Sequence, residues 1–245
     1  MAVTTSIGWT HSTWNPWIGC TKVSPGCANC YAQRMSHRRK WAVWGPGQPR
    51  HRTKTWWQPH NWNTNKPQGH HVFTASLADV FDADPGVNPA WLGEVLDVIK
   101  ACPNLIFQVL TKRIDEAAAR LPTLIAARGG WTSFPNLWLG CTAENQDCWD
   151  IRVPVLLGII GPAIRFVSVE PMLGPIDPKG LKPDWIIVGG ESGPRWRPIK
   201  IEWVRAMRDF SVANGIPFFF KQWAALNPNR IPKTLDGRRW RQAPR

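Results

Sequence analysis

The sequence predicts an α/β protein built as a complete or partial (βα) barrel of the TIM type, with an N-terminal cysteine loop and an insertion rich in Trp and basic residues. Near-continuous apolar runs alternate with amphipathic segments, which is typical of a parallel sheet covered by helices. Polar side chains directly follow these runs, as they do at the mouth of such barrels. An open, doubly wound sheet is the alternative, and the lack of a glycine-rich phosphate motif after the first strand weighs against it.

The first part of the chain is expected to hold a short strand, a cysteine loop and a helix. The strand is predicted at residues 6–10 or 14–18, ahead of the loop, and the helix at residues 32–40. Residues 41–71 are rich in Pro, Gly, Asn, His and Trp and show no periodicity. We therefore expect an insertion or lid there, outside the barrel framework.

From residue 71 onward, strands and helices alternate regularly. Asn88 and Pro89 are typical of a helix start, and Gly215 is typical of a helix end. The barrel domain is assigned to residues 1–223, with the insertion inside it, and a basic C-terminal tail to residues 224–245. We expect strands at residues 71–79, 105–111, 137–142, 164–170, 185–190 and 216–223, and helices at residues 90–101, 114–127, 146–157 and 201–214.

Length and composition narrow the class of protein. The 245 residues, 43% of them apolar, are enough to bury one core with appendages. No charged start followed by an apolar run predicts a signal peptide, and no apolar run reaches the length of a bilayer crossing. We expect a cytoplasmic protein without a membrane partner, in which six cysteines indicate metal binding or chemistry instead of disulfides.

Three of these cysteines lie within eleven residues. Cys20, Cys27 and Cys30 have the spacing C-x6-C-x2-C, and a Ser-Pro-Gly turn between the first two lets the loop fold back. Three thiolates suit a 4Fe–4S cluster with one iron left open. The alternative is a structural zinc site that uses His37 or a distant cysteine as its fourth ligand. A third hypothesis is that the three thiols bind no metal.

The net charge of +13 is concentrated at the two ends of the chain. No acidic residue precedes Asp79, whereas nine basic residues do, and the last 22 residues carry six basic residues and one acid. Such ends indicate a surface for a polyanion. Solubility alone could also explain basic ends, but it does not require the absence of acids over 78 residues.

Tryptophans interleave with the first basic run. Alternating cations and indoles suit phosphate contact combined with base stacking, while core packing is the ordinary role of any single Trp. The tryptophans in question are Trp41, Trp44, Trp56, Trp57 and Trp62.

Six successive strand ends carry charged, hydroxyl or amide side chains, which predicts a shared polar site at the barrel mouth. Helix capping could account for one or two of them, such as Ser76 and Thr142. Acids and bases are balanced in the set, as binding of a zwitterion requires. The set comprises Ser76, Asp79, Thr111, Lys112, Arg113, Cys141, Thr142, Glu144, Asn145, Ser168, Glu170, Glu191, Ser192, Lys221 and Gln222.

Several motifs together give the chain a family resemblance. It resembles the phage and prophage three-cysteine-motif proteins, which are distantly related to the radical S-adenosylmethionine superfamily. The loop departs from the superfamily's common C-x3-C-x2-C spacing, and Asn29 stands where an aromatic residue is usual. The motifs are Trp14-Asn-Pro-Trp, Gly26-Cys-Ala-Asn-Cys-Tyr-Ala, Leu110-Thr-Lys-Arg, Ser168-Val-Glu-Pro, Gly189-Gly-Glu-Ser-Gly-Pro and Phe219-Phe-Lys-Gln-Trp.

The resemblance implies a radical S-adenosyl-L-methionine enzyme. Cys20, Cys27 and Cys30 would hold the 4Fe–4S cluster, whose open iron binds S-adenosyl-L-methionine. One electron, from a donor such as flavodoxin or ferredoxin, would then cleave the sulfonium and give a 5′-deoxyadenosyl radical. By the same resemblance, the cofactor-binding residues are Ser76, Asp79, Lys112, Thr142, Glu144, Ser168 and Glu170, and the substrate-binding residues are Glu191, Lys221, Gln222 and Trp223.

The basic ends and the resemblance to phage proteins indicate a nucleic-acid substrate. We expect a modified base in phage DNA, such as a hypermodified thymine, that is rearranged or functionalised at carbon by an isomerase-type or lyase-type reaction in the host cytoplasm. Arg38, Arg39, Arg50 and Arg52 would hold phosphates.

Two alternatives assign other roles to the cysteines. A zinc-stabilised nucleic-acid-binding protein without catalysis would use the same thiols and basic ends. A second cluster at Cys102, Cys141 and Cys148 is weaker, because Cys141 has the position of a small buried residue. Cys141 could otherwise donate a hydrogen atom to a substrate radical, which we consider the less favoured role.

Overall fold

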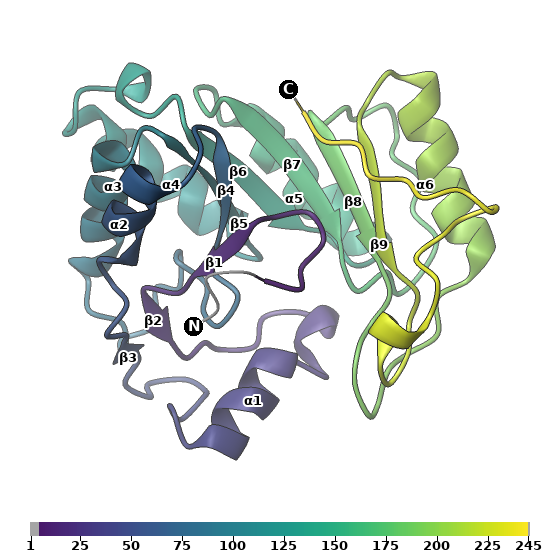
Figure 1. Ribbon diagram of the computed structural model, residues 1–245, viewed down its shortest axis with the longest axis horizontal. Helices are drawn as coiled ribbons and strands as arrows, with labels where there is room; N and C mark the ends of the chain where they lie inside the picture. Colours follow the sequence, from purple (N-terminus) through teal and green to yellow (C-terminus); the bar gives the residue numbers. More distant parts are fainter. Residues whose placement is uncertain (1–4, 245) are drawn as a thin grey trace.

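The computed structural model describes residues 5–244 and contains one curled parallel sheet (Figure 1). The strand order is β1-β4-β5-β6-β7-β8-β9, so it never reverses, and no topological switch point of a doubly wound sheet occurs. Because β1 and β9 remain separate edges, the sheet is a half-barrel, which confirms the partial-barrel prediction. The strands are β1 (Ser12–Trp14), β4 (His70–Thr74), β5 (Leu105–Thr111), β6 (Leu137–Thr142), β7 (Ile164–Val169), β8 (Trp185–Gly189) and β9 (Phe218–Gln222).

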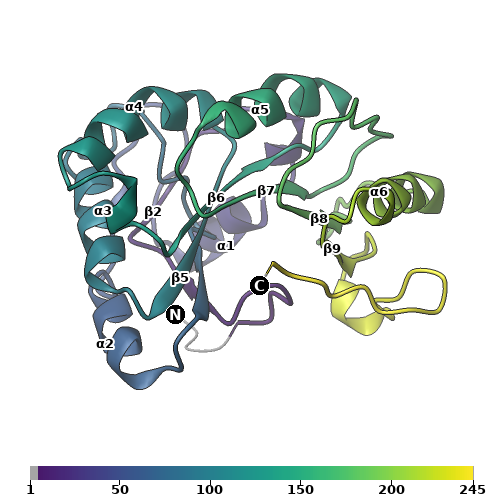
Figure 2. The same cartoon turned by 90° about the horizontal axis from the view of Figure 1, so that it is seen from above.

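Helices cover the convex face of the sheet (Figure 2). Each of four helices joins two neighbouring strands, whereas residues 170–184 join β7 to β8 without a helix. No helix within residues 5–244 combines the length and hydropathy that a membrane crossing requires. The four helices are α3 (Trp91–Ala101), α4 (Ile114–Ala126), α5 (Gln146–Gly158) and α6 (Ile201–Ala213).

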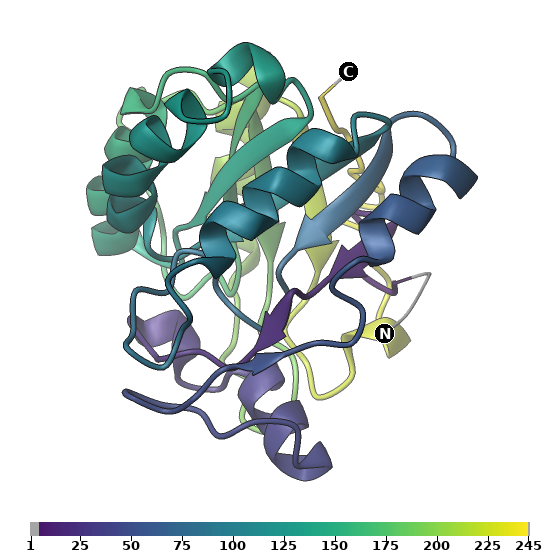
Figure 3. The same cartoon turned by 90° about the vertical axis from the view of Figure 1, so that its left-hand side faces the viewer.

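The start of the chain differs from the prediction of one strand. Pro16 lies between β1 and a second strand, β2 (Trp17–Ile18), and a proline offers no backbone N–H to a continuous ladder. β2 pairs antiparallel with β3 (His51–Arg52), which belongs to the insertion. The helix α1 (Tyr31–Arg39) follows the cysteine loop and lies beyond the carboxyl ends of the strands (Figure 3).

The insertion is more ordered and more buried than its composition predicts. It contains a helix, α2 (Gln58–Asn65), with a proline at its first turn. Trp56 and Trp62 are only 2% and 3% exposed and belong to the main apolar core. The expectation that these two indoles stack on bases is therefore wrong, because packing inside the protein already covers their faces.

The concave face of the sheet has an apolar and a polar part. Inward side chains of five strands form one buried aromatic cluster together with Trp9. At the carboxyl ends the next inward positions are polar, for example Thr142 and Ser168. The half-barrel is thus filled at one end and polar at the other. The clustered strand residues are Phe73, Trp138, Phe166, Trp185, Ile187 and Phe219.

The C-terminal segment covers one edge of the sheet. Residues 240–242 run antiparallel beside β9, where the Phe220 amide donates to the Trp240 carbonyl at 3.0 Å and the Gln242 amide to the Phe218 carbonyl at 3.1 Å. This pairing protects backbone groups that an edge strand would otherwise expose. The basic tail expected at residues 224–245 therefore pairs with the sheet edge at residues 240–242. Residues 1–4 of the expected domain and Arg245 of the tail lie outside the described residues.

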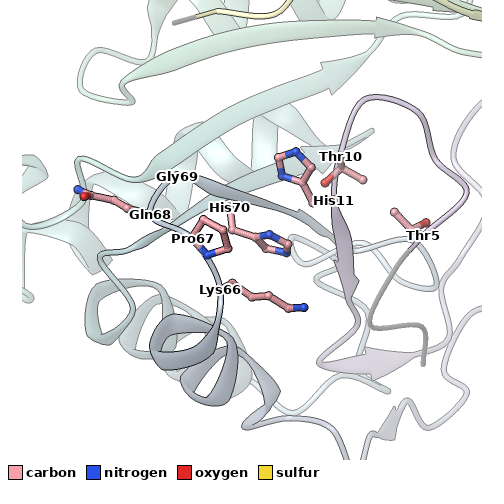
Figure 4. A pocket seen from close by; sticks show the side chains of 8 residues that line it. All are labelled: Thr5, Thr10, His11, Lys66, Pro67, Gln68, Gly69 and His70. Carbon is pink, nitrogen blue, oxygen red and sulfur yellow. The ribbon is translucent and has the colours of Figure 1, made fainter.

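Three histidines lie together near the amino ends of β1 and β4. Two of them, His11 and His70, are drawn in Figure 4. The rings of His70 and His71 have centroids 5.0 and 5.1 Å from the ring of His11, beside a cavity of about 580 Å³ that Lys66 also lines. Burial lowers the pKa of His70 and of His71 to about 4, followed by neighbouring basic groups, which are His11 and Lys66 for His70 and His11 and His70 for His71. Both imidazoles are therefore neutral in the fold at neutral pH.

We expect Gly140→Ala to lower the free energy of unfolding by about 1–3 kcal/mol, because an added Cβ would lie 2.5 Å from the buried ring of Phe166. Gly158→Ala is the matched control, since nothing lies within 4 Å of its added Cβ. Urea denaturation of both variants measures the difference. Equal midpoints for Gly140→Ala and the wild type would show that the inner face is packed less closely than described.

Stability should fall as the pH is lowered from about 6.5 towards 4. The unfolded chain takes up protons on His70 and His71 near the ordinary histidine pKa, whereas the folded chain does so only near pH 4. The stabilisation is thus fully present above pH 6.5. Urea midpoints measured across this range should depend less on pH in His71→Gln than in the wild type, and the exposed control His51→Gln should behave as the wild type. An unchanged slope in His71→Gln would contradict this account.

Candidate active site at the strand ends

A cavity of about 800 Å³ opens at the carboxyl ends of the strands. The cysteine loop, α1 and the ends of all seven strands of the sheet contribute to its wall, as expected for the mouth of a (βα) barrel. It brings together most of the side chains that the sequence singled out. Those lining it are Cys20, Cys27, Cys30, Arg39, Trp41, Trp44, Ser76, Asp79, Thr111, Lys112, Arg113, Thr142, Ser168, Glu170, Glu191, Ser192, Lys221 and Gln222.

The three thiols of the loop are free and half-buried on the wall of this cavity. The loop runs from β2 through a 3₁₀ turn, η1 (Pro25–Cys27), to the start of α1. Residues 5–244 contain no group of three or more His, Cys, Asp or Glu side chains placed to hold a metal ion. The donor set nevertheless fits a thiolate-bound cluster in kind, because it supplies three free thiols to one cavity with carboxylates and cations around them.

Glu144 holds the tip of the cysteine loop. Its carboxylate accepts hydrogen bonds from the Ser24 hydroxyl and, at 3.0 Å, from the Gly26 amide, while Arg152 donates from the other side at 2.9 Å. Gly26 permits this approach, since a Cβ there would lie 2.8 Å from the carboxylate. Burial alone would raise the pKa of Glu144, but Lys112, Ser24 and Arg152 hold it below its ordinary value, so the group is ionised.

Glu191 holds the other end of the loop. Arg197 binds its carboxylate through two nitrogens, at 2.6 and 2.9 Å, and the Asn29 side chain donates to it at 3.0 Å. Arg197 also donates to the Pro25 carbonyl at 3.1 Å. Burial would raise the pKa of Glu191, and the bonds from Arg197 and Asn29 lower it below its ordinary value. The Asn29 side chain thus ties the loop to Glu191.

Cys20 lies against a buried arginine. Arg113 donates to its sulfur at 3.5 Å and forms an ion pair with Asp79 at 3.2 Å. Burial, followed by the charge of Asp79, raises the pKa of the Cys20 thiol to about 12. The Asp79 carboxylate also accepts hydrogen bonds from Thr111 and from the Lys112 amide, so its oxygens are already engaged by the protein.

Ser76 is placed by two polar partners. The Asn15 amide donates to its hydroxyl at 3.1 Å, and the Tyr31 hydroxyl donates to its carbonyl at 2.9 Å. These bonds connect the start of α1 to the loop after β4.

The remaining polar wall combines two cations with a carboxylate and hydroxyls. Lys112 donates to the Thr142 hydroxyl at 3.2 Å, and Lys221 forms an ion pair with Glu170. Ser168 lies on the intervening strand. Lys221 and Glu170 therefore share one part of the cavity, although the sequence assigned them to substrate and cofactor separately. An ammonium and a carboxylate side by side provide opposite charges for a zwitterionic ligand.

Several predicted site residues lie elsewhere, and these expectations are corrected. Glu144 is fully buried and engaged with the loop and Arg152, so it supports the site without facing the cavity. Trp223 packs on Phe220 and donates to the Thr234 carbonyl, so its indole is not free for a substrate.

The arginines of the insertion are also corrected. Arg50 has no exposed side-chain surface and pairs with Asp82 at 2.8 Å, so a phosphate has no access to it. Arg52 pairs with Glu94 at 2.7 Å and covers the Trp56 ring, so its charge is already balanced. Arg38 and Arg39 are exposed on α1, and Arg39 lines the cavity.

Sequence reasoning missed several residues of this wall. Arg34 and Tyr31 of α1 line it, and no strand-end rule identifies them because they belong to a helix. Trp41 and Trp44, which the sequence did single out, line the cavity as well, unlike Trp56 and Trp62. The remaining cysteines, Cys102, Cys141 and Cys148, are buried among apolar side chains, and burial raises the pKa of each thiol.

We expect Glu144→Gln to loosen the cysteine loop, because hydrogen bonds to a charged acceptor contribute about 1.5–3 kcal/mol. Hydrogen exchange of the Gly26 amide should accelerate about tenfold or more, since that amide donates to the carboxylate. Glu94→Gln, which removes an exposed partner of Arg52, is the control and should leave exchange at Gly26 unchanged. Wild-type exchange at Gly26 in Glu144→Gln would argue against this role.

Comparison with known proteins gives few matches. Two solved structures of spore photoproduct lyase mutants are similar to the chain. One is a single mutant, with 13% identity and a TM-score of 0.46, and the match covers 71% of this chain and 54% of that one. The other is a double mutant with bound AdoMet and dinucleoside spore photoproduct (12% identity, TM-score 0.48, covering 80% and 59%). The chain spans a little over half the length of each.

No curated protein matches it. A family model matches residues 4–244, and the chain belongs to that family, described as DUF5131, protein of unknown function.

Proposed function

We propose that the protein is a radical S-adenosyl-L-methionine enzyme with a 4Fe–4S cluster, related to the phage three-cysteine-motif proteins, that acts on a nucleic-acid base. The observation that carries this proposal is one cavity that joins three loop thiols to opposed charged side chains at the carboxyl edge of a half-barrel. The motifs of the sequence support it, because they resemble those of that superfamily.

Cys20, Cys27 and Cys30 would hold the cluster, which supplies one electron for cleavage of the bound sulfonium and so gives a radical that abstracts hydrogen. The chain's own contribution is binding and orientation. Glu144 and Glu191 fix the two ends of the loop, so the thiols face a wall of defined shape.

The polar wall would bind the amino-acid part of the cofactor. Glu170 offers a carboxylate to its ammonium group, while Lys112 and Lys221 offer cations to its carboxylate. Thr142 and Ser168 add hydroxyl groups that can donate or accept. Asp79 and Ser76, which are bonded within the protein, complete the wall beside Cys20. The aromatic floor of the half-barrel keeps water out below these groups.

Exposed cations near the mouth support a nucleic-acid substrate. Arg34 and Arg39 extend from α1 beside Trp41, whose ring lies 4.9 Å from the Arg39 guanidinium. Further positive charge gathers near Lys221 of the cavity wall: burial lowers the pKa of Lys233, as do the charges of Lys221, Arg241 and Arg239, in that order. These cations and the half-buried indole of Trp41 suit phosphates and an unstacked base. We propose DNA with a modified base, such as the hypermodified thymine of phage DNA, as the substrate.

Anaerobic reconstitution tests the enzyme class. The protein should turn brown, bind about four irons per chain, and release 5′-deoxyadenosine from S-adenosyl-L-methionine when dithionite is added. Alanine at Cys20, Cys27 or Cys30 should abolish both properties, whereas Cys148→Ala should retain them because that thiol is outside the cavity wall. A colourless protein that binds zinc tightly would instead favour a non-catalytic nucleic-acid-binding protein.

A DNA arm tests the substrate class separately. Fluorescence anisotropy with labelled single-stranded and duplex DNA should show binding that weakens steeply with salt. Arg39→Gln should weaken it more than Arg52→Gln, since Arg52 is paired with Glu94. If DNA neither binds at moderate salt nor stimulates 5′-deoxyadenosine release, the substrate class is wrong while the enzyme class stands.

A further inference from the structure

Two buried arginines and three aspartates form a continuous ladder of charges beside the cysteine loop. Arg50 pairs with Asp82 at 2.8 Å and with Asp84 at 3.6 Å. Asp82 also pairs with Arg113 at 3.2 Å, and Arg113 continues to Asp79 at 3.2 Å. The side chains of Arg50 and Asp82 are 0% and 2% exposed, so this ladder is little screened by salt.

The arginines of the ladder also contact Cys20 and Thr21 of the cysteine loop. Arg113 donates to the Cys20 sulfur at 3.5 Å and to the Thr21 carbonyl at 2.8 Å. Arg50 donates to the Thr21 hydroxyl at 2.8 Å. Cys27, by comparison, has the neutral Ser24 hydroxyl 3.8 Å from its sulfur. The Cys20 sulfur is therefore in direct contact with a buried cation. The Cys27 sulfur lies beside a neutral hydroxyl, and the charged groups Glu144 and Arg197 hold the turn around it through Gly26 and Pro25.

Because of its net charge, the ladder interacts strongly with a negative charge on the Cys20 sulfur. Two guanidinium groups face three carboxylates, so the ionised ladder has one excess negative charge. A thiolate at Cys20 adds another, and Arg113 is the ladder cation in contact with that sulfur. The burial of these groups makes each interaction stronger than it would be in water.

We propose that Arg113 is a positioning residue that sets the reduction potential of the cluster through Cys20, with Asp82 acting in the opposite direction. This inference rests on the proposed function, because it requires Cys20 to hold an iron. Hydrogen bonds and charges near the ligating sulfurs are established determinants of cluster potential.

The physical reason is the charge that reduction adds. One electron from an external donor such as dithionite makes the cluster and its thiolates more negative by one unit. A guanidinium at the ligand sulfur stabilises this reduced state and raises the potential. A carboxylate behind that guanidinium disfavours the reduced state and lowers the potential.

Two substitutions with opposite expected signs test the proposal. In Arg113→Gln the cation is lost while an amide donor remains for Asp79, so the ratio of reduced to oxidised cluster at a fixed potential should fall about tenfold, which is about 59 mV for one electron. In Asp82→Asn one carboxylate is lost, so that ratio should rise about threefold. Arg165→Met is the control, since it removes a paired arginine at the amino end of β7.

The readout is a redox titration of the anaerobically reconstituted protein, followed by electron paramagnetic resonance, with iron content measured on the same samples. Opposite shifts in Arg113→Gln and Asp82→Asn, with no shift in Arg165→Met, are the expected result. Shifts of the same sign, or unchanged potentials at full iron content, would overturn the inference. If Arg113→Gln does not fold, the sign of the Asp82→Asn shift decides alone.

This test separates the inference from the function beneath it. A wild-type protein that takes up no iron under anaerobic reconstitution overturns the proposed function, and the inference with it. A wild-type protein that binds four irons per chain but whose potential is insensitive to both substitutions leaves the function standing and rejects only the role of Arg113.

Discussion

The docking of the cysteine loop onto the strand ends is the interaction on which the rest of the site depends. Glu144 and Glu191 reach it from the ends of β6 and β8, and Arg113 reaches it from the end of β5. Because parallel strands of a half-barrel end at one edge, three separate strands can hold one loop. Without these contacts the thiols would belong to a solvent-exposed loop, and the polar wall would have no thiols opposite it.

The strands could be predicted where sequence and environment agree. β5 and β6 have the predicted bounds because they are buried on both faces, so nearly every residue in them is apolar. The first strands could not be located in this way, since β1 and β2 have three and two residues and carry too little pattern. In the insertion, the Trp-rich composition that suggested an exposed surface partly reflects core packing, as at Trp56.

The location of the site could be predicted better than the role of each side chain in it. The rule that strand ends converge identified the cavity wall, including Lys112, Glu170 and Lys221. It could not tell a side chain that faces the cavity from one that supports the loop, as Glu144 does, because that depends on partners distant in sequence. The same holds for Arg50, whose partner Asp82 lies 32 residues further along the chain.

The most direct test of this account is a crystal structure of the anaerobically reconstituted protein, with anomalous diffraction recorded at the iron edge. The account predicts iron in the cavity at the strand ends, bound by the sulfurs of Cys20, Cys27 and Cys30, with one iron free of protein ligands. A single metal ion closed by four protein ligands, or iron bound away from these sulfurs, would contradict it.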